Sequence, residues 1–324
     1  MKALITGATG FIGSHLAERL LKMGMEVVCL VRDPSNLKNI KGKDVKTIKG
    51  DCSDIDTLRG IPPDLDYVFH LAGLTKSASP EGYYLANTTG TKNIVDVTLK
   101  NQKSLKRFVH LSSLAAVGPA KDDRAINESD VACPISEYGR SKLLAEEYVY
   151  NARFHLPITI IRPPVVYGPR DRDLFVFFKM INSGLAPYWK DCLYSTIYID
   201  DLINGIIQST MSEKAIGNVF FLADEKNYSQ IEIIDAIAES LNKKPIKINL
   251  PYFALSLVGF FADRIKSSSI INPDKIREMK QKRWICSSKK ATETFGFSSK
   301  VGIREGTQWT ATWYITQNWL QTKR

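Results

Sequence analysis

Cysteine and histidine are scarce in this chain of 324 residues, which has five cysteines and four histidines. The cysteines are odd in number and none forms a C-x-x-C pair, so the sequence predicts neither a disulfide framework nor a structural zinc site. The histidines are scattered without the spacing of metal ligands, and we expect no metal site. This use of cysteine, together with an N-terminus that lacks a signal-peptide core, favours a reducing, cytoplasmic setting.

Long apolar runs are also absent. The longest uncharged stretch of note, residues 248–262, contains Asn249, Pro251 and Gly259. It is shorter than the roughly 20 apolar residues that span a bilayer, so we expect no integral membrane segment. We interpret this stretch as a core helix of a small lobe, with a pocket lid or a peripheral membrane contact as alternatives.

Acidic residues are outnumbered, since 44 lysines and arginines against 34 aspartates and glutamates give a formal net charge of +10. The densest basic stretch, residues 277–290, has no interleaved run of aromatic residues, so we interpret it as a solvated face and expect no nucleic-acid partner. A modest positive field favours an anionic cofactor or substrate. The proportions of hydrophobic (44%) and charged (24%) residues are those of a globular protein.

Short apolar runs alternate with helical patterns through the first two thirds of the chain. This alternation predicts βαβ units and therefore an α/β fold, a Rossmann-type doubly wound parallel sheet with helices on both faces. The expected strands are residues 2–6, 26–31, 45–49, 67–71, 107–111, 158–162 and 219–222, and the expected helices are residues 13–23, 89–100, 137–154 and 200–209.

The alternation breaks at two places, which predicts a smaller, mainly helical substrate-binding lobe. Residues 169–190 interrupt the pattern, and helical stretches dominate after about residue 228: residues 230–241, 252–264 and 274–280, then a tryptophan-rich helix ending at Trp319. We therefore expect a dinucleotide-binding domain of residues 1–168 and about 191–227. Residues 169–190 and about 228–324 would form the substrate lobe.

A glycine-rich turn joins the first strand to the first helix. Gly7, Gly10 and Gly13 allow a tight turn whose backbone N–H groups approach a pyrophosphate at the positive end of the helix. The strand before the turn and the helix after it are the context that such a motif requires. The candidate cofactor-binding residues of this turn are Gly7, Thr9, Gly10, Phe11, Ile12 and Gly13.

A tyrosine and a lysine are spaced by four residues on the helix expected at residues 137–154. Tyr138 and Lys142 share a face of that helix, and a neighbouring ammonium lowers the pKa of a phenol from about 10. A helix N-terminus capped by Ser136 would act in the same direction. Ser113, at the end of the strand expected at 107–111, is the third candidate catalytic residue, and Ser112 replaces it if the register is shifted by one.

Together, the G-x-x-G-x-x-G turn and the Ser113, Tyr138 and Lys142 set resemble the extended branch of the short-chain dehydrogenases/reductases, the NAD-dependent epimerase/dehydratase family. The likeness runs from residue 1 to roughly 210. It implies that Ser113 hydrogen-bonds the reacting oxygen, Tyr138 is the acid/base and Lys142 holds the nicotinamide ribose. It also implies that Asn87 orders backbone near the site, and that a homodimer forms through the helices after Thr89 and Glu137.

The cofactor is expected to be NAD(P), with NADP favoured over NAD. Arg32 follows the second strand, where an arginine accommodates a 2′-phosphate, whereas an acid such as Asp33 would hold the 2′-hydroxyl of NAD. Lys142 and Tyr138 would also contact the cofactor. By resemblance the remaining cofactor contacts are Asp51 and Cys52 at the adenine, Leu71, Ala72 and Gly73 beneath the phosphates, and Pro164 and Val166 beside the nicotinamide.

Two departures from the family pattern narrow the chemistry. Leu114-Ala115 stands where sugar dehydratases carry an Asp-Glu pair, so dehydration is not expected. Residues 191–197 lack the arginine of uridine-sugar epimerases, although Arg170 or Arg172 could substitute. Aromatic residues of the expected lobe either stack an apolar ketone or form its ordinary core; they are Phe175, Phe177, Phe178, Tyr188 and Trp189.

The expected function is therefore that of an oxidoreductase that transfers hydride at a secondary alcohol or ketone of a small-molecule substrate. A nucleotide-sugar epimerase that uses the same step is the first alternative. A non-catalytic, cofactor-sensing protein is the second, and a complete Ser-Tyr-Lys set argues against it.

Overall fold

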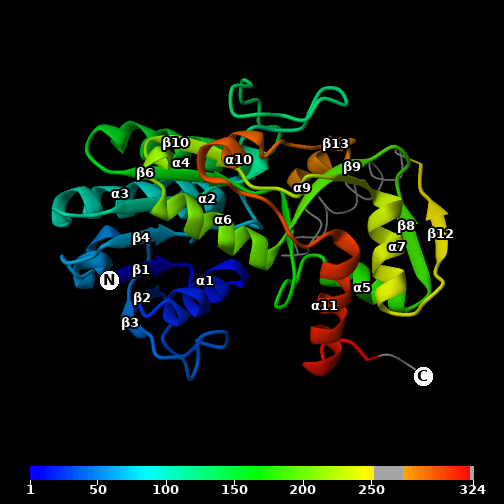
Figure 1. The fold of residues 1–324 in the computed structure, drawn as a ribbon, viewed down its shortest axis with the longest axis horizontal. Coiled ribbons are helices and arrows are strands. Elements are labelled where there is room, and N and C mark those ends of the chain that lie inside the picture. Colours follow the sequence, from blue (N-terminus) through cyan, green and yellow to red (C-terminus); the bar gives the residue numbers. More distant parts are fainter. Residues whose placement is uncertain (252–272, 322–324) are drawn as a thin grey trace.

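The computed structural model describes residues 1–251 and 273–321 of the chain. Its main sheet has seven strands in the order β10-β6-β5-β4-β1-β2-β3, and every neighbouring pair is parallel (Figure 1). The predicted doubly wound sheet is thereby confirmed. The strands are β1 (Lys2–Thr6), β2 (Glu26–Val31), β3 (Lys46–Lys49), β4 (Tyr67–His70), β5 (Arg107–Leu111), β6 (Ile158–Arg162) and β10 (Asn218–Phe221).

Helices cover both faces of this sheet because its strands bury side chains on both sides. Ile5 of β1 belongs to one cluster of buried residues with Leu16 and Ile203 from the helices on its face, whereas Leu4 belongs to a second cluster with Ile94. Successive residues of a strand thus face opposite layers. The covering helices are α1 (Phe11–Lys22) and α6 (Ile199–Met211) on one face, and α3 (Gly90–Asn101) and α4 (Glu137–Asn151) on the other.

A second group of elements lies to the right in Figure 1, around its own buried cluster. Phe178, Ile237 and Tyr314 are at the centre of that cluster, one from each of three helices. The helices are α5 (Phe175–Asn182), α7 (Gln230–Ser240) and α11 (Ile303–Thr316), and the parallel strands β8 (Leu185–Tyr188) and β12 (Ile246–Asn249) flank them.

A small sheet lies between these two groups. Strand β9 (Leu193–Tyr198) pairs with β7 (Val165–Tyr167), β11 (Asn227–Ser229) and β13 (Arg283–Trp284). Shorter helices complete the described chain: α2 (Pro80–Tyr83), α9 (Pro273–Met279), α10 (Lys289–Phe295), the π-helix η2 (Tyr84–Thr89), and the 3₁₀ turns η1 (Ile55–Gly60), η3 (Leu114–Ala116), η4 (Ala152–Phe154) and η5 (Glu213–Ala215).

Several expectations from the sequence need correction. The helix expected at 137–154 ends at Asn151 and continues as a 3₁₀ turn. Ile248 and Asn249 belong to β12, so the stretch 248–262 does not begin as a helix. The rest of that stretch from residue 252, and the whole helix expected at 252–264, lie outside the described residues. Within the described ranges, no helix is both long and apolar enough to span a membrane.

Candidate active site

The glycine turn between β1 and α1 is built where only glycine fits. Gly7 has a φ of 76°, and a Cβ there would lie 2.8 Å from the Ala72 nitrogen. A Cβ on Gly13 would lie 2.3 Å from the Gly7 carbonyl oxygen. Gly10 is the N-cap residue of α1 and has no side chain that could accept from the first N–H groups of the helix. This backbone cradle fits a dinucleotide pyrophosphate.

Arg32 and Asp33 follow β2 beside this turn. The Asp33 Oδ1 accepts hydrogen bonds from the backbone nitrogen of Ser35 at 2.9 Å and from its hydroxyl at 2.7 Å, so Asp33 is engaged in its own turn. The exposed Arg32 guanidinium has no ion-pair partner in the part of the chain that the structure describes. The side chain of Asn39 donates to the Thr9 carbonyl oxygen at 2.8 Å and ties the loop after β2 to the glycine turn.

The structure brings the other predicted cofactor segments to the same edge of the sheet. The Leu71 and Ala72 nitrogens donate to the carbonyl and hydroxyl oxygens of Thr6, at 3.2 and 3.1 Å. Cys52 is buried, and its carbonyl oxygen accepts from Asn93. Asp51 Oδ1 accepts hydrogen bonds from the backbone and hydroxyl of Ser53, which leaves Oδ2 as its second acceptor.

Ser113, Tyr138 and Lys142 meet at the carboxyl end of β5. Ser113 is the N-cap residue of η3, and its side chain shares a hydrogen bond with that of Tyr138, so Ser113 and not Ser112 occupies this position. Tyr138 is the second residue of α4, whose N-terminus is capped by Ser136 as predicted. Lys142, one turn further, is buried and donates from Nζ to the Leu111 carbonyl oxygen at 2.7 Å.

The electrostatics of this trio differ from the expectation. Burial raises the pKa of Tyr138 to about 12, and the hydrogen bond with Ser113 opposes this only in part. The expected lowering of the Tyr138 pKa is therefore wrong for the protein alone, because desolvation of the phenolate outweighs the other effects. Burial also lowers the pKa of Lys142 to about 8, against the charge of Glu146, which raises it.

Asn87 orders backbone beside the trio, as expected. It lies in the π-helix η2, an irregularity often found at functional sites. Its side chain accepts from the Leu74 nitrogen at 2.7 Å and donates to the Leu74 carbonyl oxygen at 3.0 Å and to the Ser141 hydroxyl at 2.9 Å. These bonds hold the loop that follows Gly73, and a Cβ at Gly73 would lie 3.9 Å from Lys142 Nζ.

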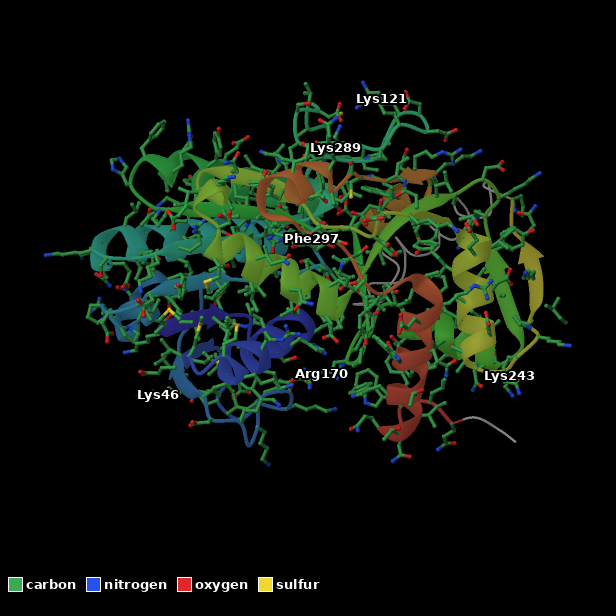
Figure 2. All side chains as sticks on the ribbon, in the orientation of Figure 1. Lys46, Lys121, Arg170, Lys243, Lys289 and Phe297 are labelled. Carbon is green, nitrogen blue, oxygen red and sulfur yellow. The ribbon has the colours of Figure 1, made fainter. Side chains whose placement is uncertain are left out.

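Pro164 and Val166 follow β6 near the same edge. The Leu114 nitrogen donates to the carbonyl oxygen of the preceding Pro163 at 2.9 Å, which places this segment beside Ser113. Arg170, a few residues later, lies next to α1 in Figure 2, where it donates to Ser14 at 3.1 Å and forms an ion pair with Glu18. Arg170 is thus engaged by α1, and its substitution for a uridine-site arginine stays a prediction.

The aromatic residues of segment 169–190 mainly form core and do not line the space beside Tyr138. Phe178 is fully buried, and the ring of Phe175 lies 4.8 Å from that of Tyr314 between centroids. Phe177 and Tyr188 pack on the same cluster, and the backbone nitrogen of Trp189 donates to the Gln230 side chain. The cavity beside Tyr138 has a volume of about 10 Å³ and is lined by Thr75, Lys76, Tyr83, Tyr138, Asp274, Lys275 and Glu278.

Sequence reasoning missed two features around Lys142. Glu146, four residues further along α4, forms a buried ion pair with Arg162 of β6. The i, i+4 spacing from Lys142 was a signal for a functional carboxylate. His70 and His110 stack beneath the site with ring centroids 5.4 Å apart, and burial lowers the pKa of His70 to about 3. In the described ranges no group of three or more metal-ligating side chains is found.

A parallel sheet with a glycine cradle and a Ser-Tyr-Lys trio at its carboxyl edge defines a dinucleotide-dependent enzyme of the Rossmann type. The model of the NAD dependent epimerase/dehydratase family matches residues 3–220, and the chain belongs to that family.

Three similar proteins illustrate the range of that family. The chain is 27% identical to ceramide reductase of Caulobacter vibrioides, over 98% of this chain and 95% of that protein. It is 28% identical to an uncharacterized UDP-glucose epimerase, YtcB, of Bacillus subtilis, over 86% of this chain and 95% of that protein. The solved UDP-glucuronic acid 4-epimerase of Bacillus cereus in complex with NAD is 26% identical, with a TM-score of 0.77 over 99% of this chain and 100% of that chain.

Proposed function

We propose that this enzyme is an NADP-preferring oxidoreductase that transfers hydride between the nicotinamide and a secondary alcohol or ketone of a small molecule. The observation that carries the proposal is the assembly of Ser113, Tyr138 and Lys142 at the carboxyl end of β5. The nicotinamide would supply or accept the hydride. Ser113 would donate a hydrogen bond to the substrate oxygen, and Tyr138 would give that oxygen its proton during reduction.

The backbone cradle at Gly7, Gly10 and Gly13 supports pyrophosphate binding, and Lys142 would hold the nicotinamide ribose. The other expected cofactor contacts lie along the same edge of the sheet. They are Thr9, Phe11, Ile12, Asp51, Cys52, Leu71, Ala72, Gly73, Pro164 and Val166. A preference for NADP is supported by Arg32, which has no acidic partner in the described chain, and by Asp33, which is engaged by Ser35. A 2′-phosphate would give the guanidinium the bidentate partner that it lacks.

Substitution of Arg32 tests the cofactor preference. Arg32→Ala should weaken NADPH binding roughly 10- to 100-fold, the scale of a charge-assisted hydrogen bond, and should leave NADH binding nearly unchanged. Arg59→Ala is the control, because Arg59 is exposed and pairs with Asp56 on η1. An equal loss for NADH and NADPH would show that Arg32 does not recognise the 2′-phosphate.

Reduction is favoured over epimerisation by the Arg32 site, and over dehydration by Leu114 and Ala115, which are buried and carry no carboxyl after Ser113. The likeness to ceramide reductase supports testing ketones on long-chain amides. The likeness to YtcB keeps a UDP-sugar epimerase as the second candidate. We place the substrate between the dinucleotide-binding domain, residues 1–168 and about 191–227, and the lobe of residues 169–190 and about 228–324.

Cofactor absorbance distinguishes these candidates. Net oxidation of NADPH with a ketone supports the reductase, whereas inversion of a UDP-sugar without net change of cofactor supports the epimerase.

Tyr138→Phe should bind NADPH normally and lose turnover by roughly 10²- to 10⁴-fold, the range of general acid–base catalysis. Tyr150→Phe on the same helix is the matched control, since Tyr150 is exposed. Full turnover by Tyr138→Phe would refute the proposed acid, and binding without turnover on every substrate would favour a cofactor sensor.

A homodimer would bury the exposed apolar side chains on α3 and α4. Leu99 on α3 and Leu144 and Tyr148 on α4 are each about two fifths exposed. Helices α3 and α4 pack against each other, so these apolar side chains lie on neighbouring elements. Light scattering on Leu144→Asp should report a monomer if these side chains form the interface. Val131→Asp, at a highly exposed position of the loop before α4, is the control.

A further inference from the structure

The first turn of the catalytic helix α4 is held by a helix that lies far away in the sequence. Asp274 of α9 accepts a hydrogen bond from the Glu137 nitrogen on Oδ1 at 2.8 Å, and another from the Tyr138 nitrogen on Oδ2 at 3.0 Å. The Ser136 hydroxyl accepts from the Gly139 nitrogen and donates to Glu278 Oε1 at 2.8 Å. Two carboxylates of α9 thus bond to the end of α4 that carries Tyr138.

These contacts satisfy backbone groups that a helix cannot satisfy by itself. The first N–H groups of a helix lack intrahelical acceptors, and most helices cover them with a local cap. Ser136 covers only one of them, and Asp274 covers two more. The Asp274 and Glu278 side chains are 11% and 12% exposed. The indole nitrogen of Trp284 donates to the Glu278 carbonyl oxygen at 3.0 Å and fixes α9 to β13.

We propose that Asp274 and Glu278 are positioning residues for Tyr138, which fix the first turn of α4 and keep the phenol protonated as a donor to the substrate oxygen. The proposal rests on the acid role of Tyr138 given above. By itself, the positive end of a helix would stabilise a phenolate at Tyr138. A carboxylate bonded to those same N–H groups offsets that effect, and so α9 favours the protonated side chain.

The surroundings of Tyr138 agree with this direction. The charge of Glu278 raises the pKa of Tyr138. Lys76 forms an ion pair with Asp173. Lys275 and Arg277 form ion pairs with Glu278 and Asp274 and offset part of the charge of these two carboxylates. The titratable or charged groups that line the cavity with Tyr138 or act on its pKa are Tyr83 on α2, Lys76 and Asp173 on loops, and Asp274, Lys275 and Glu278 on α9. Glu137, Arg140 and Lys142 lie on α4 itself, and Arg277 on α9 pairs with Asp274.

The cavity between α9 and Tyr138 makes this influence local. Its volume of about 10 Å³ holds no more than about one water molecule, so little solvent screens the carboxylates from the phenol. A substrate group that approaches the Tyr138 phenol through this cavity would contact α9 directly. The same two carboxylates are therefore placed to act on the proton donor during turnover.

A titration of Tyr138 in Asp274→Asn and Glu278→Gln tests the proposal. The phenolate of Tyr138 is isolated as the ultraviolet difference between each protein and the same protein carrying Tyr138→Phe, so no substrate is needed. Each carboxylate that is removed should lower the pH at which this phenolate appears by roughly one unit, the shift expected from one nearby charge. If Tyr138→Phe keeps full turnover, the proposed function fails, but this titration still gives its result.

Glu232→Gln is the matched control, because Glu232 completes the capping box of α7. It should lower thermal stability without moving the Tyr138 titration. If Asp274→Asn does not fold, Glu278→Gln decides alone, since Ser136 still caps Gly139 in that variant. Titrations of both α9 variants that coincide with wild type and Glu232→Gln would show that α9 only stabilises α4, and would overturn the proposal.

Discussion

The ion pair between Glu146 on α4 and Arg162 on β6 joins the helix that carries Tyr138 and Lys142 to the sheet, and its removal should destabilise the fold. Arg162 Nε donates to Glu146 Oε1 at 2.9 Å and to Oε2 at 3.1 Å, and Nη2 donates to Oε2 at 2.5 Å. The side chains are only 9% and 5% exposed. Removal of either partner would leave the other as a charge in a site with almost no water.

The magnitude follows from that burial. Breaking a buried, hydrogen-bonded pair from one side costs about 3–5 kcal/mol, whereas replacing both partners by apolar residues of similar size is often close to neutral. We therefore expect Glu146→Leu and Arg162→Met each to lower the thermal midpoint by roughly 6–10 °C, at about 2 °C per kcal/mol for a chain of this size. The double variant should recover most of this loss.

Thermal unfolding followed by circular dichroism measures the three midpoints. The exposed pair Lys92–Asp96 on α3 is the control, with side chains 44% and 41% exposed. Asp96→Leu should cost no more than about 0.5 kcal/mol, as is usual for surface pairs on helices. If either Glu146→Leu or Arg162→Met costs less than about 1 kcal/mol, or if the double variant loses the sum of the single losses, our account of this pair is wrong.

Two further predictions concern the cofactor cradle and the pH dependence of turnover. Gly13→Ala would place a Cβ 2.3 Å from the rigid Gly7 carbonyl oxygen, so it should abolish NADPH binding measured by fluorescence. Gly60→Ala is the control and should bind NADPH normally, because the space around Gly60 is open. Normal binding by Gly13→Ala would refute the proposed cradle. With the pKa of Lys142 lowered to about 8, its ammonium is lost as the pH rises through that value, so turnover should fall there. Glu146→Gln should move this fall to lower pH, because the Glu146 carboxylate raises the Lys142 pKa; an unchanged pH–rate profile would contradict that assignment.

The sequence predicted those parts of the fold that depend on patterns among residues close together in the chain. The glycine spacing, the buried strands and the amphipathic helices of the main sheet each depend on residues close together in the chain. The strands β7, β9, β11 and β13 were missed, since β9 pairs with segments about 30 and 90 residues away. The same limit applies to Asp274, which lies 136 residues from Tyr138 and has no motif to mark it.

The histidines show most clearly what a scan of the sequence leaves out. His70 Nε2 bonds to the Thr91 hydroxyl at 2.9 Å, and that hydroxyl donates to the Asn87 carbonyl oxygen at 2.5 Å. Because the Thr91 hydroxyl hydrogen is used in that bond, Thr91 Oγ1 accepts a hydrogen bond from the N–H at His70 Nε2. His70 is neutral because burial lowers its pKa to about 3, so Nδ1 accepts from the Thr6 hydroxyl at 2.7 Å.

Thr6 in turn accepts from the Ala72 nitrogen, and one buried chain of hydrogen bonds therefore links the end of β1, the segment under the glycine turn and the π-helix that holds Asn87. A protonated His70 would present a second donor to Thr6 and break this order. Its partners are 64 and 21 residues away, at distances no periodicity reveals. His70 thus links the glycine turn to the π-helix beside Ser113, Tyr138 and Lys142, a role that only the assembled fold defines.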